Sequence, residues 1–169
     1  MNLKNTLDAL KNRRSVRGYA CKPIPREILE EIIECARFAP TANDVQPWEF
    51  VVVTEQETLK KLAAICEYGK FIKSAGACVL VLSQNVKYYL EDCSAATENI
   101  LLAAANFGVG SCWVAGDKKP YCADILALVG APAELKLVSV LALGYPRSAD
   151  VFRMAKKRAL KDVLHWERF

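Results

Sequence analysis

Three guanidinium groups and one hydroxyl lie within five residues near the start of the chain. Arg13, Arg14 and Arg17 surround Ser15 in the run RRSVR. A planar guanidinium presents N–H donors in a fork that matches phosphate oxygens, and a serine hydroxyl adds a further donor. A basic turn at the C-terminal end of a helix would explain the same residues, because cations are favourable there. The segment therefore predicts either a phosphate site or a turn that caps a helix.

A second basic cluster lies near the other end of the chain and consists of Arg153, Lys156, Lys157, Arg158 and Lys161. Such clusters are commonly solvated faces, but two of them could instead enclose one anion if the chain ends meet. The net charge of +4 is small for a nucleic-acid binder, and neither cluster is interleaved with aromatic residues. The pattern favours a small anionic ligand. A nucleic-acid module that uses both clusters stays an alternative.

A polar segment between two prolines is the third candidate. Residues 39–48 read APTANDVQPW, so small and polar groups lie between Pro40 and Pro47. Trp48 leads directly into an apolar run. The segment is either a stiff connection that buries Trp48 in the core or a loop that contacts a ligand.

Several kinds of catalytic site have no support in the sequence. The single histidine, His165, lies four residues from the last residue and is a poor partner for a serine or cysteine nucleophile. No G-x-G-x-x-G run follows a predicted strand, and the seven cysteines include no C-x-x-C pair. We expect free thiols, no metal and no catalytic side chain. A demanding reaction would then come from a bound organic cofactor.

The periodicity of apolar residues predicts the elements that position these segments. Helices are expected up to Asn12, over 25–39, over 54–66 with a Thr54–Glu57 capping box, over 88–107 and over 121–129. Strands are expected at 48–53, 77–82, 111–115 and 137–143. Since the order lacks a regular βαβ rhythm, we expect an α+β fold with a mixed central sheet flanked by helices.

The length and composition set the scale of the molecule. The 169 residues, 53% of them hydrophobic, fit one domain spanning 1–169 with a core of its own. The 88–107 helix is apolar around most of its circumference, which predicts cover from a second subunit as well. No apolar run approaches the ~20 residues that cross a bilayer, and the start has no signal-peptide core. We therefore expect a cytoplasmic protein with no membrane association.

Five motifs in order resemble the FMN-dependent nitroreductase family. Its R-x-S-x-R/K motif is matched at 13–17, its A-P-[ST]-x-x-N-x-Q-P-W loop at 39–48, and its G-x-G-S-C-W turn at 108–113. Its L-G-Y-P motif is matched at 143–146, and its K-x-R motif at Lys156 and Arg158. The loop departs from the family pattern at Asp44, where an asparagine is usual. The resemblance covers nearly the whole chain.

The resemblance implies a homodimer with FMN at the interface, a long interface helix and a C-terminal extension swapped between subunits. In that arrangement Arg13, Arg14 and Ser15 hold the phosphate and ribityl chain, and Lys156 and Arg158 close on the phosphate. Arg17, with Lys70 as a further cation, would lie at the N1 and C2 carbonyl edge of the flavin. The partner's loop would contribute Pro40, Thr41, Ala42, Asn43 and Asp44. The backbone of Val114, Ala115 and Gly116 would face flavin N5, with Gly116 permitting close approach.

The implied reaction is ping-pong. NADH or NADPH would donate hydride to flavin N5 and leave, and a small-molecule acceptor such as a nitroaromatic or a quinone would take its place. Residues 66–70 lack an asparagine that many relatives direct at the flavin, so Glu67 or a neighbour would have to substitute. Alternatives on the same fold are a reductive dehalogenase, a flavin-cleaving enzyme, and a non-catalytic flavin-binding or sensor protein.

Overall fold

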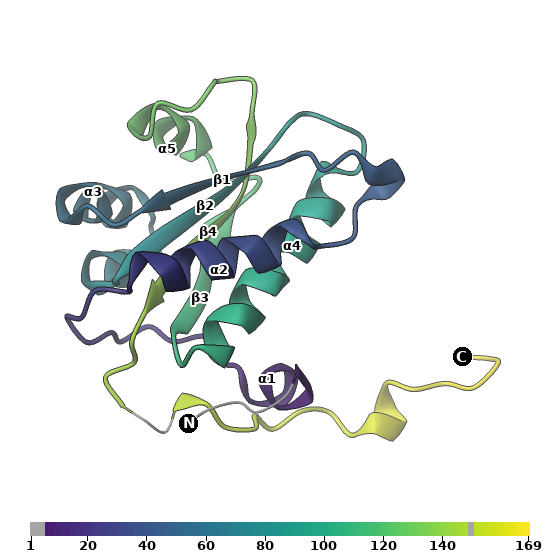
Figure 1. The fold of residues 1–169 in the computed structure, drawn as a ribbon. Coiled ribbons are helices and arrows are strands. Elements are labelled where there is room, and N and C mark those ends of the chain that lie inside the picture. The colour runs from purple at the N-terminus through teal and green to yellow at the C-terminus, as the bar shows by residue number, and fades with distance from the viewer. Residues whose placement is uncertain (1–5, 149–150) are drawn as a thin grey trace.

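A four-stranded sheet lies at the centre of the molecule (Figure 1), for which a computed structural model describes residues 6–148 and 151–169. The strands β1 (Trp48–Val53), β2 (Ala77–Ser83), β3 (Gly110–Gly116) and β4 (Lys136–Gly144) are arranged in the order β1-β2-β4-β3. Every neighbouring pair is antiparallel. The predicted α+β class is confirmed. The predicted mixture of strand directions is wrong, since the one parallel pairing among the described residues is an isolated bridge between Ser15 and Ser111.

The two central strands explain why strand direction could not be predicted from composition. All seven residues of β2 are buried, and only Lys136 of β4 is exposed. Continuous apolar runs of this kind are common in parallel sheets because helices cover both faces. Here helices also cover both faces of an antiparallel sheet. The apolar runs therefore indicate that both faces are buried and do not indicate the direction of the strands.

Helices form a layer on each side of the sheet (Figure 1). On one face lie α2 (Arg26–Arg37) and α4 (Tyr89–Asn106). On the other lie α3 (Gln56–Ile65), α5 (Cys122–Leu128) and the short η2 (Lys70–Ser74). Helix α1 (Thr6–Asn12) packs against the end of α4, and two further short turns are η1 (Ala42–Asp44) and η4 (Leu160–Asp162). Within the described ranges, every helix is too short or too polar to span a membrane.

The start of α3 corrects the predicted capping box. Glu55, and not Thr54, is the N-cap: its carboxylate accepts hydrogen bonds from the backbone N–H groups of Glu57 (2.9 Å) and Thr58 (2.5 Å). A carboxylate is favourable at this end of a helix because the macrodipole is positive there. The helix consequently begins at Gln56.

The buried thiol of Cys66 leads to a prediction about alkaline stability. Burial raises its pKa to about 11, and the nearby cation of Lys70 opposes this only in part. In the unfolded chain a thiol ionises near ~8.5, so the folded state holds the proton more tightly. The stability that the neutral Cys66 thiol contributes is complete below the pKa of the unfolded chain, and it is lost as the pH rises toward the folded pKa of about 11. Denaturation at about pH 8 and about pH 11 should show a smaller loss of unfolding free energy for Cys66→Ala than for the unchanged chain. Equal losses would contradict this.

Candidate functional site

The two basic ends of the chain meet at one open cavity of about 880 Å³. Residues 14–18 form one wall, and Arg147, Ser148, Val151 and residues 153–156 form the other. Among the described residues that line it, none is acidic. The cavity therefore has a strongly positive lining, to which the first basic segment and the tail both contribute, as the phosphate hypothesis requires.

The first wall is fixed by its attachment to β3. The backbone N–H of Val16 donates to the carbonyl of Ser111 (2.9 Å), and the Val16 side chain is buried beside Gly110. Ser15 and Arg17, on either side of Val16, are exposed. Because side chains alternate along an extended segment, anchoring Val16 inward turns the hydroxyl and the guanidinium of its neighbours outward.

Tyr19 supports this wall from inside the protein. Its side chain is fully buried, and its hydroxyl lies within hydrogen-bond distance of the carbonyls of Val16 (2.6 Å) and Ala142 (3.1 Å). Burial raises the pKa of Tyr19 far above its usual value, so the phenol stays neutral. Tyr19 thus links the first wall of the cavity, residues 14–18, to strand β4.

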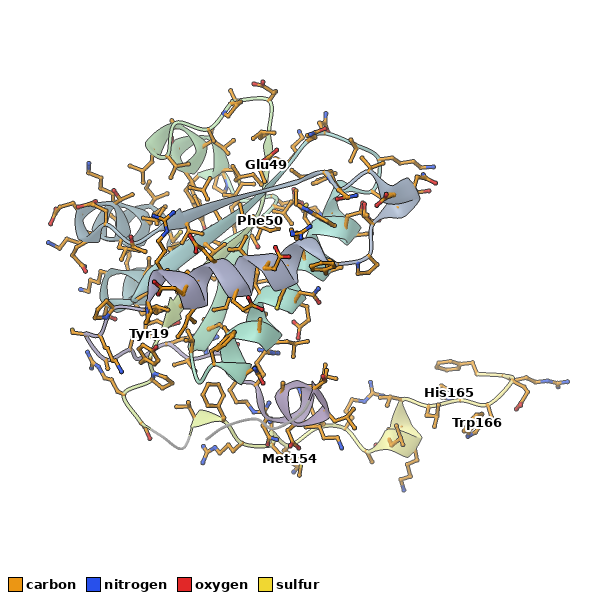
Figure 2. The ribbon with its side chains drawn as sticks, viewed as in Figure 1. Tyr19, Glu49, Phe50, Met154, His165 and Trp166 are labelled. Carbon is orange, nitrogen blue, oxygen red and sulfur yellow. The ribbon has the colours of Figure 1, made fainter. Side chains whose placement is uncertain are left out.

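The second wall is the first part of the tail. Phe152 is buried against Ala9 of α1 and Ala105 of α4, which docks the tail at this point. Residues 153–156 then follow the cavity and are exposed. Figure 2 shows Met154 on this segment, whereas His165 and Trp166 lie far out on the tail, away from the sheet.

Unsatisfied polar atoms mark both ends of β3. Among the described residues, four buried side-chain atoms have no hydrogen-bond partner: Arg13 Nε, Arg14 Nε, Ser111 Oγ and Asp117 Oδ2. The first three lie where the first basic segment meets the start of β3, and Asp117 follows its end. An unpaired buried polar atom costs about 1–3 kcal/mol. Two of the four atoms take part in ion pairs, Arg13 Nε with Glu98 Oε1 at 3.4 Å and Asp117 Oδ2 with Lys118 Nζ at 3.9 Å. Arg14 Nε and Ser111 Oγ are therefore the partnerless atoms that suit a ligand at the start of β3.

Three of the predicted cations do not line the cavity. Arg13 forms an ion pair with Glu98 of α4 at 3.4 Å. Lys70 donates to the carbonyl of Ala64 (3.0 Å), and Arg158 donates to the carbonyl of Asp162; both residues are exposed. Of the predicted phosphate ligands, the structure thus brings together Arg14, Ser15 and Lys156, with Arg17 beside them.

Gly116 is required by the neighbouring strand. A Cβ atom at Gly116 would lie 1.8 Å from the carbonyl oxygen of Val138, so the glycine permits the close approach of β4. Val114 packs near Gly69 at the start of η2, since a Cβ there would lie 2.9 Å from Val114 Cγ1. The backbone from Val114 through Ala115 to Gly116 belongs to β3, an edge strand of the sheet.

The predicted loop from Pro40 to Asp44 does not line the cavity of its own chain. It is held instead by Asp92 of α4, which accepts hydrogen bonds from Thr41 Oγ1 (2.8 Å) and from the backbone N–H of Ala42 (3.2 Å). Asn43 and Asp44 both have φ of 55°, a region that asparagine and aspartate tolerate better than most residues. Asp44 stands where the family pattern has an asparagine, and its carboxylate accepts a hydrogen bond from Gln46 Nε2 (2.8 Å). The additional negative charge therefore has a hydrogen-bond partner within the loop.

Replacing Asp92 tests how this loop is held. Asp92→Ala should lower the unfolding free energy by about 1–3 kcal/mol, because the Thr41 hydroxyl and the Ala42 N–H lose their acceptor. Hydrogen exchange should accelerate at residues 41–46 more than elsewhere. Glu91→Ala, one position earlier and exposed, is the matched control. Uniform acceleration along the chain would contradict a local role for Asp92.

Sequence reasoning missed two contributors to this architecture. Asp92 had only a weak signal, because Glu91 and Glu98 of the same helix are also acidic, and the structure is what shows that Asp92 is buried. Arg147 had none, since it follows the L-G-Y-P run as a single cation with no periodic partner.

The chain has close relatives among known proteins. The family profile described as "Nitroreductase family" matches residues 10–83, and that described as "Putative TM nitroreductase" matches residues 60–168. A protein of Archaeoglobus fulgidus named "Putative NADH dehydrogenase/NAD(P)H nitroreductase" is 36% identical over 99% of this chain and 100% of its own length. The chain belongs to the nitroreductase family.

Solved structures agree with this family assignment. An FMN-dependent nitroreductase of Clostridium difficile has a TM-score of 0.86 and 26% identity, covering 96% of this chain and 99% of its own. Oxidised iodotyrosine deiodinase, solved with FMN and 3-iodo-L-tyrosine, has a TM-score of 0.83 and 25% identity, covering 98% of this chain and 100% of its own. The resemblance predicted from the five motifs is confirmed.

Proposed function

We propose that this nitroreductase-family chain is an FMN-dependent oxidoreductase that carries electrons from NAD(P)H to a small-molecule acceptor such as a nitroaromatic or a quinone. The observation that carries the proposal is the basic cavity at the meeting of the two chain ends, which has no acidic side chain among its described lining residues. The names of the Archaeoglobus and Clostridium proteins support the same activity class.

The residues present fit FMN. A phosphate dianion needs cations and hydrogen-bond donors. The cavity offers Ser15, Arg17 and Lys156, with no carboxylate among the described residues that line it. The partnerless Arg14 Nε and Ser111 Oγ lie at the same end of β3. A volume of about 880 Å³ is within the range of small-molecule sites.

Each part of the site then has a task. Ser15 and Lys156 bind the phosphate, with Arg14 beside them. Arg17 stabilises negative charge on the reduced cofactor, with Lys70 as a further cation. The main chain at 114–116 contacts the ring. When bound, FMN supplies the two-electron redox chemistry, and the open cavity lets the two substrates enter in turn, in a ping-pong sequence with protons from solvent.

We further propose that the chain, as one domain over residues 1–169, forms a homodimer whose loops 40–44 each complete the partner's site. The loop lies away from the cavity of its own chain. Large apolar side chains on the tail are left exposed: Met154, Leu160, Val163, Trp166 and Phe169. Half-buried apolar residues along α4, such as Ala95 and Leu102, offer a surface for the same contact. The seven free cysteines suit a reducing compartment, which we propose to be the cytoplasm.

The visible spectrum of the purified protein tests the proposal. Flavin absorption bands that bleach on anaerobic addition of NAD(P)H and return on addition of a nitroaromatic or a quinone are expected. Sedimentation of the same sample should give twice the mass of the chain. A colourless protein that takes up no FMN supplied in excess would contradict the proposal.

Reductive dehalogenation is the second candidate, because the solved iodotyrosine deiodinase matches almost the whole chain. The same anaerobic sample distinguishes the two activities. Reoxidation of the flavin by 3-iodo-L-tyrosine with release of iodide, and none by nitroaromatics or quinones, would favour the deiodinase reaction.

A further inference from the structure

Arg147 lines the basic cavity but belongs to none of the five family motifs. It follows Pro146, where the chain leaves strand β4 and enters the tail. It is therefore the first residue of the second wall, and it is hydrogen-bonded to residues 18 and 19 at the end of the first.

Two hydrogen bonds fix Arg147 against the first wall. Its backbone N–H donates to the carbonyl of Gly18 (3.2 Å), and its Nε donates to the carbonyl of Tyr19 (2.8 Å). Tyr19 is fully buried and held by its own hydroxyl contacts. The Nε bond orients the guanidinium. Neither terminal nitrogen of Arg147 has an acceptor among the described residues, so their four N–H groups can bind a ligand.

Two other arginines of the phosphate hypothesis are less well prepared for a bidentate contact. Arg14 donates from its two terminal nitrogens to the carbonyls of Arg13 and Lys11. Arg158 donates to the carbonyl of Asp162 and does not line the cavity. An arginine whose Nε is anchored while its terminal N–H groups remain available matches phosphate oxygens well.

We propose that Arg147 is a phosphate ligand that determines the specificity of this site for FMN over riboflavin, in the position expected of Arg158. The inference rests on the proposed placement of FMN in this cavity. Arg147 contributes a directed guanidinium fork, and the four other lining cations, Arg14, Arg17, Arg153 and Lys156, add positive potential.

Flavin binding to the flavin-free chain measures this directly. Isothermal titration with FMN and with riboflavin is carried out on the unchanged chain and on Arg147→Gln, Arg147→Lys and Arg158→Gln. Arg26→Gln, an exposed arginine on α2, controls for net charge. We expect Arg147→Gln to weaken FMN binding at least about 10-fold, as loss of a charged hydrogen bond predicts, and to leave riboflavin affinity within about 2-fold. Arg147→Lys should recover part of the loss, because it keeps the charge without the fork.

The outcomes separate the two levels of the argument. If Arg147→Gln binds FMN as tightly as the unchanged chain, or if only Arg158→Gln loses FMN affinity, the inference is overturned and the proposed function stands. Equal loss of FMN and riboflavin in Arg147→Gln also overturns it, since the effect would then not involve the phosphate. An unchanged chain that binds neither flavin overturns the proposed function together with the inference.

Discussion

Replacing Arg17 and Lys156 together by glutamine is expected to lower the affinity for FMN at least about 100-fold. The two residues come from opposite ends of the chain and line the same cavity. A hydrogen bond to a charged group contributes about 1.5–3 kcal/mol, so two such contacts account for a loss of this size. Titration of the flavin-free chain with FMN measures it.

The matched control is the double substitution Arg26→Gln and Lys61→Gln. Both residues are exposed on helices away from the cavity, and their loss changes the net charge equally. This variant should retain its FMN affinity within about 2-fold, because exposed charges at a distance are screened by salt. Similar losses in both double variants would show that net charge, and not the cavity, governs binding.

Gly116→Ala is expected to reduce the free energy of unfolding by about 3 kcal/mol, toward the upper end for overpacking. The added Cβ would lie 1.8 Å from the Val138 carbonyl oxygen and 2.8 Å from Ser139 Cα, which are backbone atoms that cannot rotate away. The pairing of β3 with β4 would have to open at Gly116 and Ser139. Urea denaturation followed by circular dichroism measures the change.

Gly18→Ala is the steric control for that experiment, since no atom lies within 4 Å of a Cβ built at Gly18. Its unfolding free energy should stay within about 0.5 kcal/mol of the unchanged value. A Gly116→Ala protein as stable as this control would show that the strand ends adjust freely around position 116.

Local sequence patterns predicted most elements of the fold. The strand at Trp48–Val53 was placed at its observed bounds, and the long helix was placed within one residue at each end. Strand direction was not predictable, because the apolar runs of β2 and β4 record cover on both faces. The cap at Glu55 was missed because the usual pattern favours a hydroxyl residue, and Thr54 lies one position earlier. In the structure the Glu55 carboxylate takes the place of that hydroxyl.

The lining of the basic cavity was predictable where its residues are neighbours in the sequence. Ser15 and Arg17 were found together because both turn outward around a single buried Val16. The place of Arg147 in the cavity required knowledge of where the chain passes after β4. Arg158 lies outside the lining because the tail follows the cavity only for a few residues after Phe152, where it is packed against α1 and α4. The sequence predicted a polar segment at Asn43 and Asp44 but not its left-handed backbone. The residue that holds this loop, Asp92, lies about fifty positions away, so no local pattern links the two.

The edge position of β3 has a consequence for how such a protein can evolve. Beyond the bridge at Ser111, the outer side of this strand pairs with no other strand among the described residues. Along such an edge every residue supplies a backbone carbonyl, and every residue except proline also supplies an amide donor. In the proposed site, mutation at the exposed Trp113 would therefore alter which molecules are accepted and leave the contacts of the peptide backbone intact. A scaffold of this kind can acquire new selectivity without first losing its prosthetic group.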